Sequence, residues 1–135
     1  MNTSKLSATQ TALLNTALRV QKNAYAPYSN FKVGAALLAN NGKVYVGCNV
    51  ENAAYPLGTC AEAGAISAMI ADGGTAIVEI IIVGPGDEPC YPCGGCRQKI
   101  AEFSEATTKV VMQTGQEDVT AMTIAELLPA AFKLG

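Results

Sequence analysis

The sequence predicts a single α/β domain in which helices cover a β-sheet. Three observations support this prediction: an N-terminal segment with helical periodicity, an Asn-Gly pair between two apolar runs, and a buried-type apolar run in the middle of the chain. At 135 residues the chain is long enough to bury one core but too short for two. Residues 1–135 are therefore expected to form one domain.

The first predicted element is a helix over residues 9–23. Its apolar residues recur every three or four positions, which is the period of an α-helix. Either Ser7 or Thr9 is suited to cap its start. The helix is expected to end before Pro27, because the residue that precedes a proline resists helical geometry.

A β-hairpin is predicted next. Apolar runs at residues 32–38 and 43–49 flank Asn40-Asn41-Gly42, and an Asn-Gly pair between apolar runs is the strongest short-range signal of a hairpin. Residues 50–59 contain a proline, a glycine and polar residues. They are predicted to form a loop.

The rest of the chain alternates between helices and strands. The predicted elements are a helix at 61–71, a strand at 76–83, a helix at 93–103, a strand at 109–113 and a final helical turn at 123–128. The apolar run at 76–83 indicates a central strand that is buried on both faces. Such alternation after a hairpin predicts parallel crossovers, with helices covering the sheet.

Composition and charge exclude several classes of function. The net charge is −2 and the nine basic residues are not clustered, whereas nucleic-acid binding needs a basic face. No stretch approaches about 18 uninterrupted apolar residues, so no membrane span is expected. The N-terminal residues lack a signal-peptide core, and a cytoplasmic protein is expected. Half of the residues are hydrophobic and only 15% are charged, which suggests that some surface is buried against other subunits.

The chain has five cysteines and no histidine. In a reducing cytosol, cysteines at such spacings favour metal binding over disulfides. Without histidine, proton transfer near neutral pH must use a carboxylate with a shifted pKa, a lysine, a tyrosine or metal-bound water.

Two cysteine motifs predict a metal centre. Cys93 and Cys96 lie three residues apart where a loop enters a helix, and Cys60 lies with Glu62 at the start of another helix. Helix starts carry a partial positive charge that favours thiolates. Structural zinc has four protein ligands, whereas three thiolates leave one position for water, as in a hydrolytic site. The pattern matches the three-cysteine variant of the zinc deaminase signature.

The residues alone leave alternatives open. Cys90 can supply a fourth thiolate and close the site into a structural zinc centre, although it is poorly placed to join Cys93 and Cys96. Glu62 can be an ordinary surface acid favoured by the helix dipole. Its spacing of two from Cys60 is awkward within a regular helix, and becomes workable if Cys60 lies at the very start.

Five other residues also have two interpretations. On composition alone, Phe31, Tyr55 and Phe132 are expected in the core or in an interface rather than against a ligand. Asn49 and Glu51 lie at the start of the predicted loop, where spacing alone is compatible with either a turn or a binding role.

Five ordered motifs resemble the cytidine deaminase family in its short, homotetrameric, three-cysteine form. They span nearly the whole chain: Tyr28-Ser29-x-Phe31-x-Val33-Gly34-Ala35-Ala36, Gly47-Cys48-Asn49-Val50-Glu51-Asn52, Cys60-Ala61-Glu62, Pro92-Cys93-Gly94-Gly95-Cys96-Arg97-Gln98 and Leu127-Leu128-Pro129-x-x-Phe132. The resemblance implies a three-layer α/β/α sandwich around a mixed five-stranded sheet. It also implies hydrolytic deamination of cytidine and 2′-deoxycytidine in pyrimidine salvage. The nearest alternative substrate is a related cytosine nucleoside such as blasticidin S.

The resemblance also implies roles for single residues. One Zn²⁺ per subunit is expected on Cys60, Cys93 and Cys96, with Glu62 as the proton shuttle. The residues expected to contact the nucleoside are Phe31, Asn49, Glu51, Tyr55, Ala61 and Phe132. Some of these contacts are expected to cross subunit boundaries, because the active sites of the family lie at the interfaces of a homotetramer.

One position departs from the family pattern. Many members of the short form carry an arginine after Cys-Ala-Glu, where this chain has Ala63. Zinc with three thiolates has a formal charge of −1, which weakens its power to acidify water. The helix N-termini and Arg97 are therefore expected to offset more of the thiolate charge.

Overall fold

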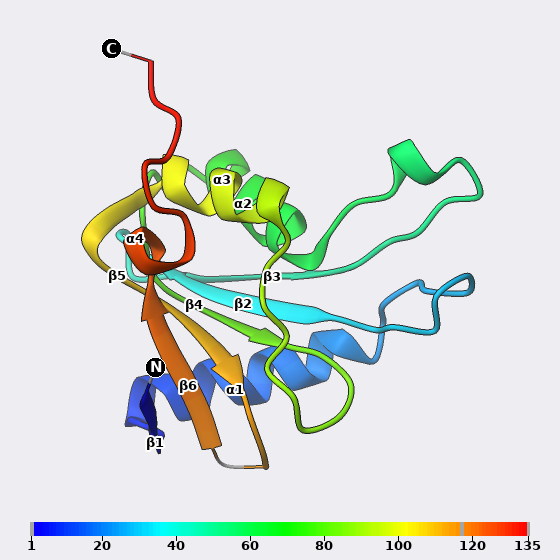
Figure 1. The fold of residues 1–135 in the computed structure, drawn as a ribbon, viewed down its shortest axis with the longest axis horizontal. Helices are drawn as coiled ribbons and strands as arrows, with labels where there is room; N and C mark the ends of the chain where they lie inside the picture. Colours follow the sequence, from blue (N-terminus) through cyan, green and yellow to red (C-terminus); the bar gives the residue numbers. More distant parts are fainter. Residues whose placement is uncertain (1, 117, 135) are drawn as a thin grey trace.

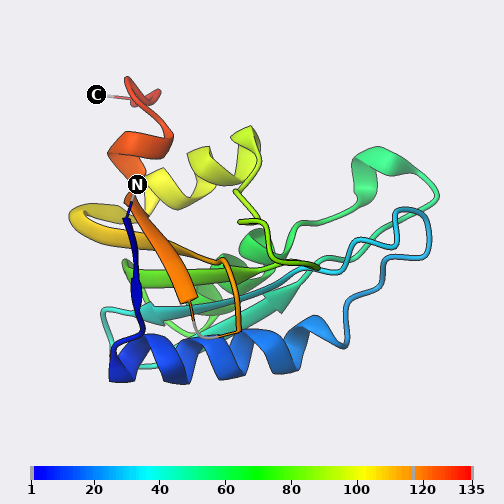
Figure 2. The same ribbon diagram turned by 60° about the horizontal axis from the view of Figure 1, so that its bottom comes forward.

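The computed structural model describes residues 2–116 and 118–134 and shows three layers, with one β-sheet between two layers of helices (Figures 1 and 2). One helix covers one face of the sheet and three cover the other. These helices are α1 (Ala8–Gln21) on the first face, then α2 (Ala61–Ala71), α3 (Gly94–Glu102) and α4 (Ile124–Leu127). The expected α/β/α sandwich is confirmed. None of the described helices combines the length and the apolar character needed to cross a bilayer.

The sheet has six strands among the described residues, one more than expected. In chain order they are β1 (Asn2–Lys5), β2 (Gly34–Ala39), β3 (Val44–Cys48), β4 (Ile77–Val83), β5 (Ser104–Gln113) and β6 (Asp118–Thr123). Their spatial order is β1-β6-β5-β4-β2-β3. Strands β2 to β6 form the expected mixed five-stranded sheet, and β1 adds an edge strand that pairs antiparallel with β6.

The connections through α2 and α3 are the parallel crossovers that the sequence predicts. Strands β4 and β5 pair in parallel, with α3 between them in the chain. Strands β3 and β4 both pair antiparallel with β2, so they run parallel to each other, and α2 connects them. Both helices therefore start at the same side of the sheet, near the carboxyl ends of strands that point the same way.

Cap and turn chemistry sets the bounds of the first elements. Ser7 caps α1 in a capping box: its hydroxyl accepts from the Gln10 backbone N–H at 3.1 Å, and the Gln10 side chain accepts from the Ser7 N–H at 3.0 Å. In the hairpin, Gly42 has a φ of +82°, a conformation that glycine adopts without steric cost. The predicted β2–β3 hairpin is confirmed.

The core has two parts, one on each face of the sheet, and β4 contributes to both. Ile80 and Ile82 belong to the part that packs under α2 and α3, whereas Ile81 and Val83 belong to the part under α1. All four side chains are fully buried. Because successive residues of a strand face opposite sides, this alternation confirms that β4 is buried on both faces.

Helix α2 lies very close to β3, because Gly47 has no side chain. A Cβ at Gly47 would lie 2.2 Å from the Ala61 carbonyl oxygen and 2.6 Å from the Ala65 backbone nitrogen. Gly64 lies on the helix side of the same contact, where an added Cβ would be 3.5 Å from the Gly47 Cα. The contact at Gly47 therefore sets the distance of the first turn of α2, which carries Glu62, from the sheet.

We expect Gly47→Ala to lower the free energy of unfolding by about 1–3 kcal/mol, because the new methyl group overlaps helix backbone that must shift. Gly64→Ala is the matched control, since its Cβ makes only ordinary contacts and alanine favours a helix over glycine by about 1 kcal/mol. Urea unfolding followed by circular dichroism measures both. Wild-type stability in Gly47→Ala would contradict the close seating of α2 on β3.

Candidate metal centre and active site

Three thiols from two helix starts lie together beside the sheet edge. The Sγ atoms of Cys60, Cys93 and Cys96 are all within 4.8 Å of one another. A tetrahedral zinc site with Zn–S bonds of about 2.3 Å places its sulfurs about 3.8 Å apart. The three sulfur atoms therefore need to move only slightly closer together to bind the ion. Thiolates select zinc among the common divalent cations. This donor set fits one Zn²⁺ per chain and leaves the fourth position without a thiol from the described residues.

The start of α3 stabilises the thiolate form of Cys93, whereas burial disfavours ionisation of the other two thiols. Cys60 and Cys93 are the N-cap residues of α2 and α3, both in extended conformation, and Cys96 lies in the first turn of α3. The backbone N–H of Cys96 lowers the pKa of Cys93. Burial raises the pKa of Cys60 and of Cys96, so these two thiols need a bound cation to ionise near neutral pH.

Glu62 is the second residue of α2 and its side chain is only 4% exposed. Cys60 precedes the helix in extended conformation, so the awkward spacing of two within a regular helix does not arise. Burial raises the pKa of Glu62, and the carboxyl lines the same cavity as Cys60 and Cys93. A buried carboxyl in such a place is suited to take up and release a proton.

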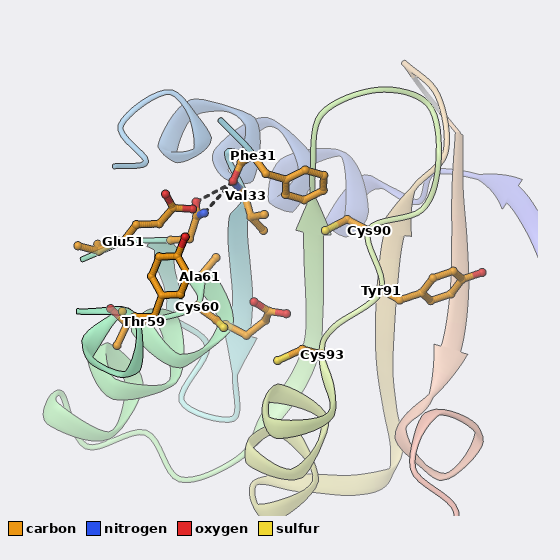
Figure 3. A pocket seen from close by; sticks show the side chains of 14 residues that line it. Phe31, Val33, Glu51, Thr59, Cys60, Ala61, Cys90, Tyr91 and Cys93 are labelled. Atoms are coloured by element: carbon orange, nitrogen blue, oxygen red, sulfur yellow. Dashed lines mark hydrogen bonds between the residues drawn. The ribbon is translucent and has the colours of Figure 1, made fainter. Parts of the chain in front are cut away.

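A cavity of about 370 Å³ opens beside the thiols (Figure 3). Its volume is in the range of small-molecule sites. Of the six residues expected to contact a nucleoside, five line it: Phe31, Asn49, Glu51, Tyr55 and Ala61. They come from the loops that flank β2 and β3 and from the start of α2, which the structure brings to the same edge as the cysteines.

Phe132 does not reach the cavity within one chain. Its side chain is 69% exposed after α4 and lines a separate hollow with Gln98 and Leu134. The Gln98 side-chain amide donates to the Phe132 carbonyl oxygen at 3.2 Å, which ties this segment to α3. A contact between Phe132 and a substrate stays a prediction.

Asn49 and Glu51 organise the loop that carries Phe31. The Asn49 side chain donates to the Phe31 carbonyl at 2.8 Å and accepts from the Val33 N–H at 2.8 Å. Glu51 accepts hydrogen bonds from the backbone N–H of Ser29 at 3.1 Å and from the Ser29 hydroxyl. These bonds lower the pKa of Glu51, so this carboxylate is ionised at the cavity edge.

Cys90 lines the cavity but is not part of the thiol group. The geometry therefore does not support the alternative in which Cys90 closes a four-thiol structural site. Its side chain packs instead over Gly84, at the end of β4. Sequence reasoning considered Cys90 only as a ligand and missed its place in the cavity wall; its closeness to Cys93 in the chain was the one available signal.

Arg97 contacts backbone carbonyls near the metal centre. Its Nε donates to the Pro92 carbonyl at 2.7 Å and its Nη1 donates to the Leu127 carbonyl at 2.8 Å. The side chain thus ties the residue before Cys93 to the end of α4. Both of these hydrogen bonds go to carbonyl oxygens and neither goes to sulfur, whereas Cys60 and Cys93 lie at helix starts.

Comparison with known proteins agrees with this geometry. A family model described as "Cytidine and deoxycytidylate deaminase zinc-binding region" matches residues 7–114. A cytidine deaminase of Halalkalibacterium halodurans is 44% identical over 120 residues, which cover 89% of this chain and 91% of that protein. The crystal structure of cytidine deaminase from Burkholderia pseudomallei has a TM-score of 0.85 at 45% identity and covers 94% of this chain and 100% of that one. The crystal structure of cytidine deaminase from Mycobacterium leprae has a TM-score of 0.80 at 39% sequence identity. The match covers 91% of this chain and 99% of that one. The chain belongs to the cytidine deaminase family.

Proposed function

We propose that this protein catalyses the zinc-dependent hydrolytic deamination of cytidine and 2′-deoxycytidine to uridine and 2′-deoxyuridine, with release of ammonia, in pyrimidine salvage. The observation that carries the proposal is the meeting of three thiols and the buried Glu62 at one cavity. Relatives with the name cytidine deaminase support the substrate class.

Cys60, Cys93 and Cys96 are the proposed zinc ligands. The bound ion supplies Lewis-acid activation of water near neutral pH. Two of the ligands are N-cap residues, so the positive ends of α2 and α3 offset part of the negative charge of three thiolates. This support matters because Ala63, the residue after Glu62, carries no charge.

Glu62 is the proposed proton shuttle. It accepts a proton from the attacking water and donates it to N3 of the pyrimidine, which makes C4 electrophilic. It then takes the second proton from the hydroxyl group now on C4 and delivers it to the amino group, so that the C4–N bond breaks, the C4 carbonyl forms and ammonia leaves. Burial raises the pKa of Glu62, and a raised pKa supports a carboxyl that must bind and release protons in one cycle.

The other cavity residues are proposed to hold the nucleoside. Asn49 and Glu51 present an amide and a carboxylate, which suit ribose hydroxyls. A carboxylate has about four acceptor sites, and Glu51 accepts three hydrogen bonds from the protein, so one site is left for a ligand. Phe31 and Tyr55 offer aromatic faces, and the N–H groups around Ala61 face the base. The Asn49–Glu51 pair favours a ribose-bearing substrate over blasticidin S.

The assembly proposed for this chain is a homotetramer with active sites at the subunit interfaces. Large apolar side chains on the two loops near the cavity are strongly exposed, as are those after α4. Examples are Tyr25 at 54%, Tyr55 at 80%, Leu57 at 70% and Phe132 at 69%. Exposed apolar surface of this kind favours protein contacts, and a neighbouring copy is the proposed route by which Phe132 contributes to an active site.

The proposed location is the cytoplasm, and the proposed ligand is a free nucleoside rather than nucleic acid. All five cysteines are free thiols in the structure, as is usual in a reducing compartment. The net charge of −2 opposes binding to a polyphosphate backbone.

Glu62→Gln is expected to retain zinc and to lower the turnover of cytidine by about 10²–10⁴-fold, because the amide cannot carry the proton. The measurement is the ultraviolet absorbance change of cytidine with purified protein, alongside a zinc determination and a chelator-treated sample. Glu105→Gln, on an exposed part of β5, is the matched control. Turnover by Glu62→Gln within tenfold of wild type would contradict the shuttle role.

Cys90→Ser is expected to keep one zinc ion per chain, whereas Cys96→Ser is expected to lose zinc. Of these two residues, only Cys96 belongs to the group of three thiols. Elemental analysis of the purified variants by mass spectrometry measures the metal content. Zinc loss in Cys90→Ser together with retention in Cys96→Ser would show that the ligand set is wrong.

A further inference from the structure

One wall of the cavity is formed by Cys90 and Phe31 and is backed by Gly84. A Cβ at Gly84 would lie 2.9 Å from the Cys90 Cβ, 3.0 Å from the Cys90 Sγ and 3.6 Å from the Phe31 Cε1. Figure 3 shows the Cys90 and Phe31 side chains next to each other. The thiol therefore packs directly against the backbone of Gly84, just after β4. It can lie there because glycine has no side chain.

This wall is apolar. Cys90 is partly buried and packs against the core cluster between the sheet and α2 and α3. Burial and the negative charge of Glu62 raise the pKa of Cys90 to about 11, so the thiol is neutral at pH 7. A neutral buried thiol behaves as a small hydrophobic group. Together with the Phe31 ring it offers an apolar surface to a ligand.

The proposed function orients cytosine against this wall, and the inference rests on it. In the pyrimidine ring C4 lies opposite N1, which bears the ribose. A base with C4 at the thiol group and its ribose at Asn49 and Glu51 has two edges left. The N3 and O2 edge needs hydrogen-bond donors or a proton, which Glu62 and the start of α2 supply. The C5–C6 edge carries only C–H groups.

The apolar edge of the base then meets the apolar wall. Ala61 at the start of α2 and Cys90 lie on opposite sides of the cavity in Figure 3. We propose that Cys90, seated on Gly84, determines how large a substituent the enzyme accepts at C5 of the cytosine ring. The thiol and a C5 substituent compete for the same space, and one methyl group in a close-fitting pocket changes kcat/KM by roughly 10–200-fold.

Two variants change this space in opposite directions. Cys90→Ala removes the sulfur and enlarges the pocket. Gly84→Ala adds a methyl group behind the thiol and pushes it into the cavity, because the added Cβ would overlap Cys90. Cys48→Ala is the matched control, since Cys48 is another partly buried free thiol, at the end of β3, and does not line the cavity.

The experiment compares kcat/KM for cytidine and for 5-methylcytidine. Cys90→Ala is expected to raise the ratio of 5-methylcytidine to cytidine about tenfold, Gly84→Ala to lower it about tenfold, and Cys48→Ala to leave it unchanged. Inhibition of cytidine turnover by uridine and by 5-methyluridine provides a second readout that needs no reaction of a 5-methyl substrate. The affinity for 5-methyluridine relative to uridine is expected to rise in Cys90→Ala and to fall in Gly84→Ala. Zinc content is determined for each variant.

An unchanged ratio in Cys90→Ala, with cytidine still turned over, would overturn the role of Cys90 at C5. Equal losses on both substrates in Gly84→Ala, or zinc loss in Cys90→Ala, would also overturn it, because the wall would then serve the fold or the metal. Absence of cytidine turnover by the wild-type protein would instead contradict the proposed function, so the two failures are distinguishable.

Discussion

The site depends on two helices that begin at the same edge of one sheet. Strands β3 and β4 run parallel, and each is followed by a segment that leads into a helix on the same face. Parallel strands bring the segments after their carboxyl ends together. Cys60 and Cys93 occupy the N-cap positions of these helices, so residues far apart in the chain meet as one cluster. The close contact at Gly47 holds α2 at the distance from the sheet that this meeting requires.

Charge is the second constraint on the site. Three thiolates and a buried carboxyl place negative charge in a small volume, and the residue after Glu62 is uncharged Ala63. Two helices begin beside this volume, and the start of a helix carries a partial positive charge. Arg97 links the segment before Cys93 to the end of α4, because its guanidinium donates hydrogen bonds to the Pro92 and Leu127 carbonyls. The helix starts are therefore one source of positive charge for the centre.

Most of the fold could be predicted from local signals. Helix α2 has the predicted bounds, and β4 was recognisable from its apolar run. Strands β1 and β6 were missed: β6 mixes threonine and alanine with few large apolar residues, and β1 is a short polar edge strand that exists through its pairing with β6. Cys90 as a wall residue depends on its contact with distant Gly84, and the proposed role of Phe132 depends on the proposed contact with another subunit. Neither can be deduced from spacing in one chain.

The most direct test of the account is zinc K-edge X-ray absorption on the purified, active protein. We expect one zinc per chain with three sulfur scatterers at about 2.3 Å and one oxygen or nitrogen scatterer at about 2.0 Å. That result would identify a three-thiolate centre with a position open to water. Four sulfur scatterers, or full activity in protein that contains no zinc, would contradict it.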